Sequence, residues 1–454
     1  MQMSGGHLLA AGLDGGNTTV FRISTLGPNG PECQIIDSQN EFWSHFNGGN
    51  TTVFRISTLG PKLPIDKFFS FAILNTGKYD SGEELMVTKI REFIKKETVL
   101  FIAALCAAAT MLLVPPSMDY LHYIDFRVLC LLFCLMGVVA GFKNVGAFQW
   151  LTYQLLRRIK SGPILGVTLV MLPFFSSMLV TNDVALLIFV PFTLALLAQL
   201  GFEKAMIPVI VLQTVAANLG SMATPVGNPQ NLFLYAAFNL SAGEFFGVVL
   251  PLTAVSFVCL AAAAIFLLPK ELSQQDLEKA EISSIRNLII YGGLFVLCLL
   301  TVFRVVAYPV TTAIMIAALV VLNRKLLKEI DYMLLLTFVC FFIVSENLGQ
   351  VNSVRVFLQN LLDKNTLLTA VGASQIISNV PAAVLLSGFT DQWRELLAGV
   401  NIGGLGTPIA SLASLITLKL YMRWPGAKVM RFMGIFMLAN IAGLLILLGF
   451  MMLI

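Results

Sequence analysis

The chain has 454 residues, of which only 12% are charged and 57% are apolar. Soluble domains carry about 25% charged residues, so this composition excludes an ordinary water-soluble enzyme. The net charge of +4 is small and gives no sign of a nucleic-acid partner. Beyond residue 97, the apolar runs approach or exceed the length of roughly 20 residues that a helix needs to cross a bilayer. The sequence therefore predicts an all-α polytopic membrane protein, with membrane lipid as a partner.

The N-terminal region contains a stretch of 14 residues, GGNTTVFRISTLGP, that occurs twice without change, at 15–28 and 48–61. Structural repeats usually diverge in sequence. We therefore interpret residues 1–63 as an appended or tag-like segment and leave them out of the fold prediction. Residues 64–97 lead into the membrane part, and 83–97 have the pattern of an amphipathic helix at a membrane surface. A solvated helix explains that pattern equally well.

Apolar segments in the remaining chain are of two kinds. Uninterrupted spans are expected at 98–115, 126–142, 243–268, 287–304, 307–323, 331–347 and 428–453. Four other segments are broken by polar residues near their middle, at 163–200, 205–238, 367–390 and 393–422. Each break contains Gly, Pro, Asn or Thr, which a continuous membrane helix avoids at that depth.

The two halves of the membrane part resemble each other. Residues 124–156 align with 330–362 without a gap, at an offset of 206. Further along, the tripeptide TND at 181–183 corresponds to SNV at 378–380, and each half has a Thr-Pro pair in its second break. We interpret this order as a duplicated unit.

The duplication divides the membrane part into three stretches. Repeat 1 is expected at 98–268 and repeat 2 at 305–454, with a cytoplasmic loop and a linker helix at 269–304 between them.

Orientation follows from the basic residues, which concentrate in cytoplasmic loops of membrane proteins. All of the basic loops can be cytoplasmic only if 163–200 and 367–390 are re-entrant helical hairpins that enter and leave on one side. The two repeats are then inverted, an arrangement common in secondary transporters. We expect nine crossings of the plasma membrane and two hairpins, with the N-terminus in the cytoplasm and the C-terminus outside.

The breaks also predict a binding site. An interrupted helix leaves backbone groups unpaired, which is tolerated only where they face protein, water or an ion. Helix N-termini attract anions, whereas carbonyl, amide and hydroxyl oxygens suit sodium. We expect a small inorganic or carboxylate anion to bind between the hairpin tips. The candidate ion- and substrate-binding residues are Thr181, Asn182, Asp183, Thr224, Gly227 and Asn228 in the first half and Ser378, Asn379, Gly406 and Thr407 in the second.

Asp183 is the most informative of these residues. A carboxylate inside a membrane is expected to be functional, as a cation ligand or a proton carrier. The alternative is a cap that accepts backbone N–H bonds at the start of the second hairpin arm, and the two roles are compatible. Two other charges, Lys143 and Glu346, stand near the ends of their spans and are interpreted as boundary charges, with a role in gating as the alternative.

Other sources of energy and chemistry are not apparent. The chain has no G-x-x-x-x-G-K-[ST], H-E-x-x-H or G-x-S-x-G motif, and its three histidines and seven cysteines lack zinc-like spacing. We therefore predict no enzyme activity and no cofactor other than bound sodium ions, with transport driven by an ion gradient or running down the gradient of the substrate. A passive channel is a weaker alternative, because channels need a continuous polar lining.

Four runs carry a family resemblance: LVTNDVALLIFVPFTLALL, GSMATPVGNPQNLFL, SQIISNVPAAVLL and VNIGGLGTPIASLASLITLKL. They resemble the citrate-transporter-like anion permeases of the ion transporter superfamily, which are related to divalent-anion/sodium symporters and arsenite permeases. The resemblance covers roughly 98–454. It implies a homodimer in which a transport domain moves against a scaffold by an elevator-like stroke.

The same resemblance implies sodium-site roles for Thr181, Asn182, Ser378 and Asn379, to which the residue-based argument adds Asp183. The dicarboxylate symporters typically have S-N-T at both hairpin tips, whereas these tips are T-N-D and S-N-V. The N-D pair is more similar to arsenite permeases. Arsenite or antimonite efflux and sodium/proton antiport therefore stay open beside coupled anion transport.

Overall fold

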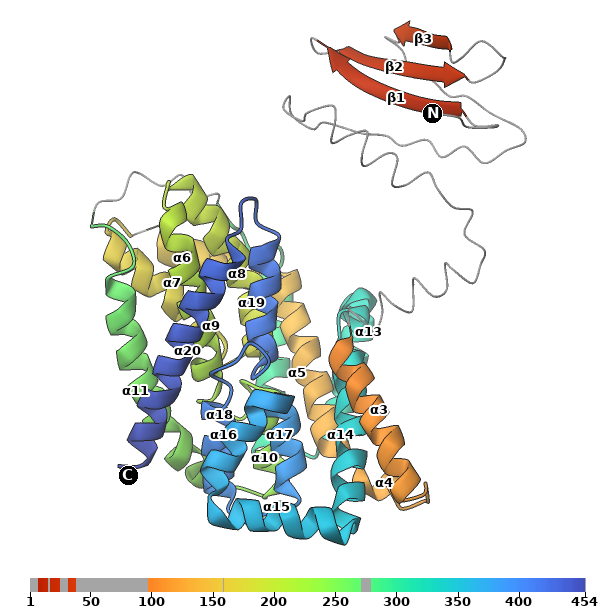
Figure 1. Ribbon diagram of the computed structural model, residues 1–454, viewed down its shortest axis with the longest axis vertical. Helices are drawn as coiled ribbons and strands as arrows, with labels where there is room; N and C mark the ends of the chain where they lie inside the picture. The colour runs from red at the N-terminus through yellow and green to blue at the C-terminus, as the bar shows by residue number, and fades with distance from the viewer. Residues whose placement is uncertain are drawn as a thin grey trace. The chain divides into compact units, whose positions relative to one another are not determined.

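The computed structural model describes residues 97–157, 159–270 and 279–453, together with the backbone of three N-terminal strands (Figure 1). Contacts divide the chain into two units, Met1–Ser81 and Gly82–Ile454, and each is taken by itself.

The N-terminal unit contains a three-stranded antiparallel sheet in the order β1-β2-β3. Its strands are β1 (His7–Asp14), β2 (Asn17–Ser24) and β3 (Glu32–Asp37). Strand β2 has the sequence NTTVFRIS, which belongs to the first copy of the duplicated stretch and is rich in β-branched residues, as strands usually are. The second copy at 48–61 and the amphipathic pattern at 83–96 lie outside the described residues.

The second unit is helical throughout its described residues. Its helices are α3 (Thr98–Leu113), α4 (Tyr120–Tyr123), α5 (Phe126–Asn144), α6 (Ala147–Leu156), α7 (Gly162–Ser176), α8 (Asn182–Gln199), η1 (Glu203–Ala205), α9 (Met206–Ser221), α10 (Pro229–Ala237), α11 (Ala242–Ile265), α12 (Ile285–Val302), α13 (Tyr308–Asn323), η2 (Arg324–Lys328), α14 (Tyr332–Gln350), α15 (Asn352–Lys364), α16 (Thr366–Ile377), α17 (Asn379–Ser387), α18 (Trp393–Ile402), α19 (Leu412–Met422) and α20 (Val429–Met451). Among the described residues, eight helical stretches are long and apolar enough to cross a membrane.

The predicted membrane character is confirmed by these helices and by their surface. The seven predicted spans correspond to α3, α5, α11, α12, α13, α14 and α20, with ends that differ by a few residues. Large apolar side chains point outward from three of them: Leu112 is 85% exposed, Val321 82% and Leu438 72%. Apolar surface on this scale is stable against lipid and unstable against water.

All four predicted breaks are present. Helix α7 ends at Ser176 and α8 begins at Asn182, while α16 and α17 are separated by Ser378 alone. The other two breaks, between α9 and α10 and between α18 and α19, are longer, covering 222–228 and 403–411.

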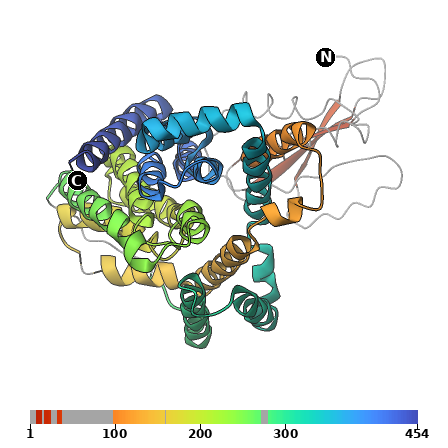
Figure 2. The ribbon, with the colours of Figure 1, turned by 90° about the horizontal axis from the view of Figure 1, so that it is seen from below.

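Packing arranges the helices in two groups (Figures 1 and 2). In one group α5 packs against α12 and α13, and α14 packs against α3. The other group contains α7 to α11 and α16 to α20, in which α10 packs against α17 and α19 against α8. The short helices α6 and α15 connect the groups along the chain, and they lie near opposite ends of the bundle (Figure 1).

Candidate binding site at four helix ends

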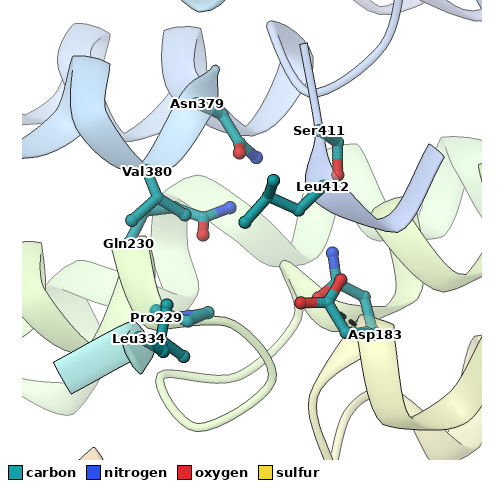
Figure 3. Close-up of a pocket in the computed structure, with 9 residues that line it drawn as sticks. Asp183, Pro229, Gln230, Leu334, Asn379, Val380, Ser411 and Leu412 are labelled. Carbon is teal, nitrogen blue, oxygen red and sulfur yellow. Dashed lines mark hydrogen bonds between the residues drawn. The ribbon is translucent and has the colours of Figure 1, made fainter. Parts of the chain in front are cut away.

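Four helices begin at one small pocket (Figure 3). Its lining residues are Asn182 and Asp183 of α8, Pro229 and Gln230 of α10, Asn379 and Val380 of α17, Ser411 and Leu412 at the start of α19, and Leu334 of α14. Because the helix dipole makes the N-terminal end of a helix partially positive, four partial positive charges surround this pocket.

Local sequence explains why the helices begin at these points. Asn228 is the N-cap of α10, and its Oδ1 accepts a hydrogen bond of 3.0 Å from the backbone N–H of Asn231. Pro229 follows at the first helical position, where a missing N–H costs nothing. Ser411 takes the N-cap position of α19, with an extended backbone. These are residue types that commonly start helices.

Asn218 joins three elements next to the pocket. Its Oδ1 accepts hydrogen bonds of 3.0 Å from Asn182 Nδ2 and of 3.0 Å from Ser411 Oγ. Asn182 also fixes the first turn of α8, because its Oδ1 accepts a 3.0 Å bond from the backbone N–H of Asp183. Asn182, Asn218 and Ser411 are all buried. An unpaired polar group at such a position is costly, so this network holds α8, α9 and α19 in one arrangement.

A second buried amide cluster lies around Asn401 of α18. Its Nδ2 donates a 2.7 Å hydrogen bond to Asn231 Oδ1, and its Oδ1 accepts a 3.4 Å bond from Asn228 Nδ2. Asn231 in turn donates from Nδ2 to the carbonyl oxygen of Met222 at 3.1 Å. This cluster therefore connects the second break of one half to the second break of the other.

Asp183 is half-buried, and within the described residues its carboxylate has no hydrogen-bond partner. The N-cap of α8 is Thr181, so Asp183 does not take the capping role that the sequence also allowed. The charged side chain that acts electrostatically on this carboxylate is another acid, Asp331, the N-cap of α14. Within the described residues, no ion pair between Asp183 and a basic side chain is found.

The two threonines of the Thr-Pro pairs bind backbone. Thr224 Oγ1 donates a 2.5 Å hydrogen bond to the carbonyl oxygen of Met178, and Thr407 Oγ1 donates a 3.2 Å bond to that of Gln375. The side chain of Gln375 also donates to the carbonyl oxygens of Gly403 and Leu405, at 2.9 Å each. Thr224 therefore attaches its break to the connection between α7 and α8, and Thr407 attaches its break to the last turn of α16.

Two glycines permit the close approach of these segments. A Cβ at Gly227 would lie 2.2 Å from the carbonyl oxygen of Ser221 and 2.8 Å from that of Ser177, so a side chain has no room there. Gly406 has a φ of +113°, a conformation that residues with a side chain rarely adopt. Ser378 adopts a φ of +73° despite its side chain, and its hydroxyl donates to the carbonyl oxygen of Ala410 at 3.4 Å.

The predicted site residues are thus close together but differ in position. Three of the ten line the pocket, namely Asn182, Asp183 and Asn379. The other seven lie in the segments around it: Thr181, Thr224, Gly227, Asn228, Ser378, Gly406 and Thr407. The sequence argument missed Gln230 and Ser411 in the lining and Asn218 and Asn401 behind it. All four are amide or hydroxyl residues in or beside a break, so a search for every such residue would have found them.

Comparison with known proteins now gives the family. The citrate transporter family matches residues 85–391. Over 331 residues the chain is 32% identical to an uncharacterized transporter of Methanocaldococcus jannaschii, covering 72% of this chain and 90% of that protein. It is 30% identical to the inner membrane protein YbiR of Escherichia coli over 304 residues, which are 65% of this chain and 80% of the relative.

A shorter match is to a silicon efflux transporter of Oryza sativa subsp. japonica, with 34% identity over 128 residues, or 28% of this chain and 26% of that protein. The match at 85–391 covers most of the helical unit, and the relatives that match over most of their length include a protein named as a transporter. With its apolar helices and its interrupted helix pairs, the chain belongs to the citrate transporter family, and it is an integral membrane transporter rather than an enzyme.

Proposed function

We propose that this transporter carries a small anion across the plasma membrane, coupled to a gradient of sodium or protons. The observation that carries the proposal is the pocket at which α8, α10, α17 and α19 all begin. The positive ends of discontinuous helices serve as anion sites in transporters, while amide and carboxylate oxygens beside them hold the coupling cation. This pocket offers both kinds of group.

We further propose that the two halves are inverted repeats. Corresponding residues make corresponding bonds: Thr224 binds the carbonyl of Met178, three residues before Thr181, and Thr407 binds that of Gln375, three residues before Ser378. The N-caps Asp125 and Asp331 likewise accept from the third residue beyond them, at 3.0 and 2.9 Å.

The contacts between halves support the same relation. Asn218 and Asn401 each stand six residues before the threonine of their Thr-Pro pair, and Asn228 and Ser411 each stand four residues after it. The observed bonds cross between these positions, Asn218 with Ser411 and Asn401 with Asn228. A pseudo-two-fold axis through the pocket would produce such exchanged pairs.

An elevator-like stroke is the mechanism that this arrangement favours. The group containing α3, α5 and α12 to α14 would form the scaffold of a homodimer, and the group with the pocket would move. Helices α6 and α15, which connect the groups near opposite ends of the bundle, would act as the arms (Figure 1). The re-entrant hairpins would be α7–α8 and α16–α17, with the N-terminus in the cytoplasm and the C-terminus outside.

The coupling cation would bind at the hairpin tips. We propose the oxygen atoms of Thr181, Asn182 and Asp183 for one sodium site and those of Ser378 and Asn379 for a second. In the first of these sets, the uncompensated Asp183 carboxylate supplies the charge that a cation needs.

Efflux of an uncharged metalloid acid, such as arsenous or silicic acid, is a second candidate function. Two observations favour it: one relative is named as a silicon efflux transporter, and the pocket contains an acid and no basic side chain. Sodium/proton antiport, in which Asp183 alone would carry the ions, is a third. A channel is disfavoured because the polar groups gather at the four breaks.

The test begins with the purified protein in detergent. A ligand that binds the folded state raises its apparent thermal stability, so citrate, succinate, sulfate and arsenite are each added with and without sodium, and sodium is also added by itself. The proposal expects stabilisation by at least one anion, and uptake of that anion into proteoliposomes that increases with an inward sodium or proton gradient. Ion currents of single-channel size, or sodium-driven proton movement without any solute, would contradict it.

A further inference from the structure

We propose that Asp183 is a built-in competitor of the transported anion. Its carboxylate and the solute use the same positive helix ends, and one monovalent cation bound at Asp183 makes these ends available to the solute. The inference rests on the proposed function and adds a rule for coupling: a solute anion binds well only when the cation is present, and this carboxylate accounts for one cation in each cycle.

The first argument is the balance of charge in the pocket. Each helix N-terminus carries about half a positive charge, and four of them border this pocket. Among the nine lining residues there is one ionisable side chain, Asp183, and it is negative when it is deprotonated. The carboxylate therefore occupies the positive field that would otherwise attract a solute anion. A second anion that enters beside it is repelled until the first is neutralised.

The second argument is that the protein itself does not neutralise this carboxylate. The amide of Asn182, its neighbour in the chain, is committed to Asn218 and to the backbone of α8. From α14, which supplies Leu334 to the lining, the charged group that acts on Asp183 is Asp331, a further acid. A partly buried charge without a partner in a membrane protein is costly. A bound cation removes that cost, which links cation binding to solute binding.

The third argument is the difference between the two halves. Asp183 is the second residue of α8, and Val380 is the second residue of α17. Both line the pocket, so they stand at matching positions at the two hairpin tips. Only the first tip carries a charge. The competition therefore involves one carboxylate and one cation, even where a second ion binds elsewhere.

The experiment measures binding of sulfate, succinate and citrate, each alone, to the purified full-length protein. One series varies sodium at fixed pH, and another varies pH without sodium, so the two sources of positive charge are separated. In wild type, the affinity for the anion is expected to increase as sodium is raised, as pH is lowered, or in both series. Asp183→Asn removes the charge at nearly constant shape. It is expected to bind the anion without the cation on the order of a hundredfold more tightly than wild type does, the scale of a unit charge at about 5 Å and an effective dielectric of about 20.

Matched variants complete the test. Asp363→Asn makes the same exchange at an exposed position of α15 and should leave the cation dependence unchanged. Val380→Asp places a second carboxylate in the pocket, so anion binding should then require two cations and show a steeper cation dependence. Val380→Asn, of similar size but uncharged, shows how much of any change is caused by a polar side chain in the pocket, and only the difference between the two variants is assigned to the second charge.

Two results would overturn the inference: a cation dependence that is unchanged in Asp183→Asn, or anion binding in wild type that responds to neither sodium nor pH. These results leave the proposed function intact if vesicles still accumulate the anion. Failure of wild-type vesicles to move any tested anion, with folded protein present, would instead remove the proposed function and the inference with it. If Val380→Asp does not fold, the Asp183→Asn comparison decides alone.

Discussion

Asn401 and Asn231 are 170 residues apart in sequence, and the Nδ2 of one donates to the Oδ1 of the other at 2.7 Å. Asn401 belongs to the last residues of α18 before its break, and Asn231 to the first residues of α10 after another break. This contact makes one buried cluster out of two interrupted helices. The position of the pocket wall formed by α10 therefore depends on a residue in the other half of the chain.

Replacing Asn401 tests how much this cluster stabilises the fold. Asn401→Ala leaves the buried Asn231 Oδ1 without its donor, and a lost buried hydrogen bond of this kind costs about 1–3 kcal/mol. We expect a lower melting temperature in detergent. Asn360→Ala, at an exposed position of α15, should change it little. Equal melting temperatures for the two variants would mean that the cluster contributes nothing.

Gly227→Ala tests the close packing of the α9–α10 break against the connection between α7 and α8. The added Cβ would lie 2.2 Å from the backbone oxygen of Ser221, which cannot move without shifting α9. Overpacking of this kind typically costs about 1–3 kcal/mol, so thermal stability and ligand binding should both decrease. Gly372→Ala makes the same change in α16 with no atom within 4 Å of the new Cβ, and should stabilise by about 1 kcal/mol because alanine favours helix.

Asp183→Asn separates coupling from folding in a transport assay. Removing an uncompensated, partly buried charge should leave the melting temperature unchanged or raise it. In proteoliposomes we expect loss of gradient-driven accumulation, while exchange of the solute down its own gradient persists. Full accumulation by this variant would remove Asp183 from the mechanism. The exposed Asp363→Asn change serves as the control and should transport as wild type does.

Arg304 connects the α12–α13 turn to the far end of α10. Its Nη1 and Nη2 donate to the carbonyl oxygens of Asn239 and Tyr235, at 3.2 and 3.3 Å, and its guanidinium lies 5.4 Å from the Tyr235 ring centroid. Arg304→Ala should destabilise the protein by about 1 kcal/mol in thermal unfolding. Arg304→Lys should recover only part of the lost stability, because an ammonium group lacks the planar guanidinium that donates to both carbonyl oxygens at once.

A control for Arg304 is Arg355→Ala on α15, where the side chain is exposed and no hydrogen bond or ring contact is found within the described residues. The Arg355→Ala variant should have the same melting temperature as wild type. If the melting temperature of Arg304→Ala is also unchanged, the contacts of Arg304 with α10 do not stabilise the fold.

The proposed topology predicts which loops a reagent can reach. In a variant without its seven native cysteines, a cysteine introduced at Asp391 should react with a membrane-impermeant maleimide in intact cells. One introduced at Lys279 should react only after the cells are opened, because this basic loop is expected in the cytoplasm. The reverse pattern would invert the orientation, and labelling of both positions in intact cells would contradict the crossing pattern.

The sequence alone predicted the membrane helices and the four breaks. Hydropathy and backbone hydrogen bonding act over a few residues, so Gly, Pro, Asn and Thr in an apolar run predict a break wherever they gather. For that reason the end of α7 at Ser176 and the start of α8 at Asn182 agree with the predicted break near the middle of 163–200. The three strands near the N-terminus were not predicted, because the duplicated stretch was excluded from the fold.

Only the tertiary structure decided which polar residues of the breaks face the pocket. The sequence predicted Thr224 and Thr407 as ligands because each is a hydroxyl residue in a break. In the structure their hydroxyls donate to the backbone carbonyls of Met178 and Gln375 instead. Gln230 and Ser411 line the pocket because α10 and α19 begin there. A side chain's partner in these clusters lies up to 193 residues away, and the packing of whole helices, which no local pattern encodes, determines that pairing.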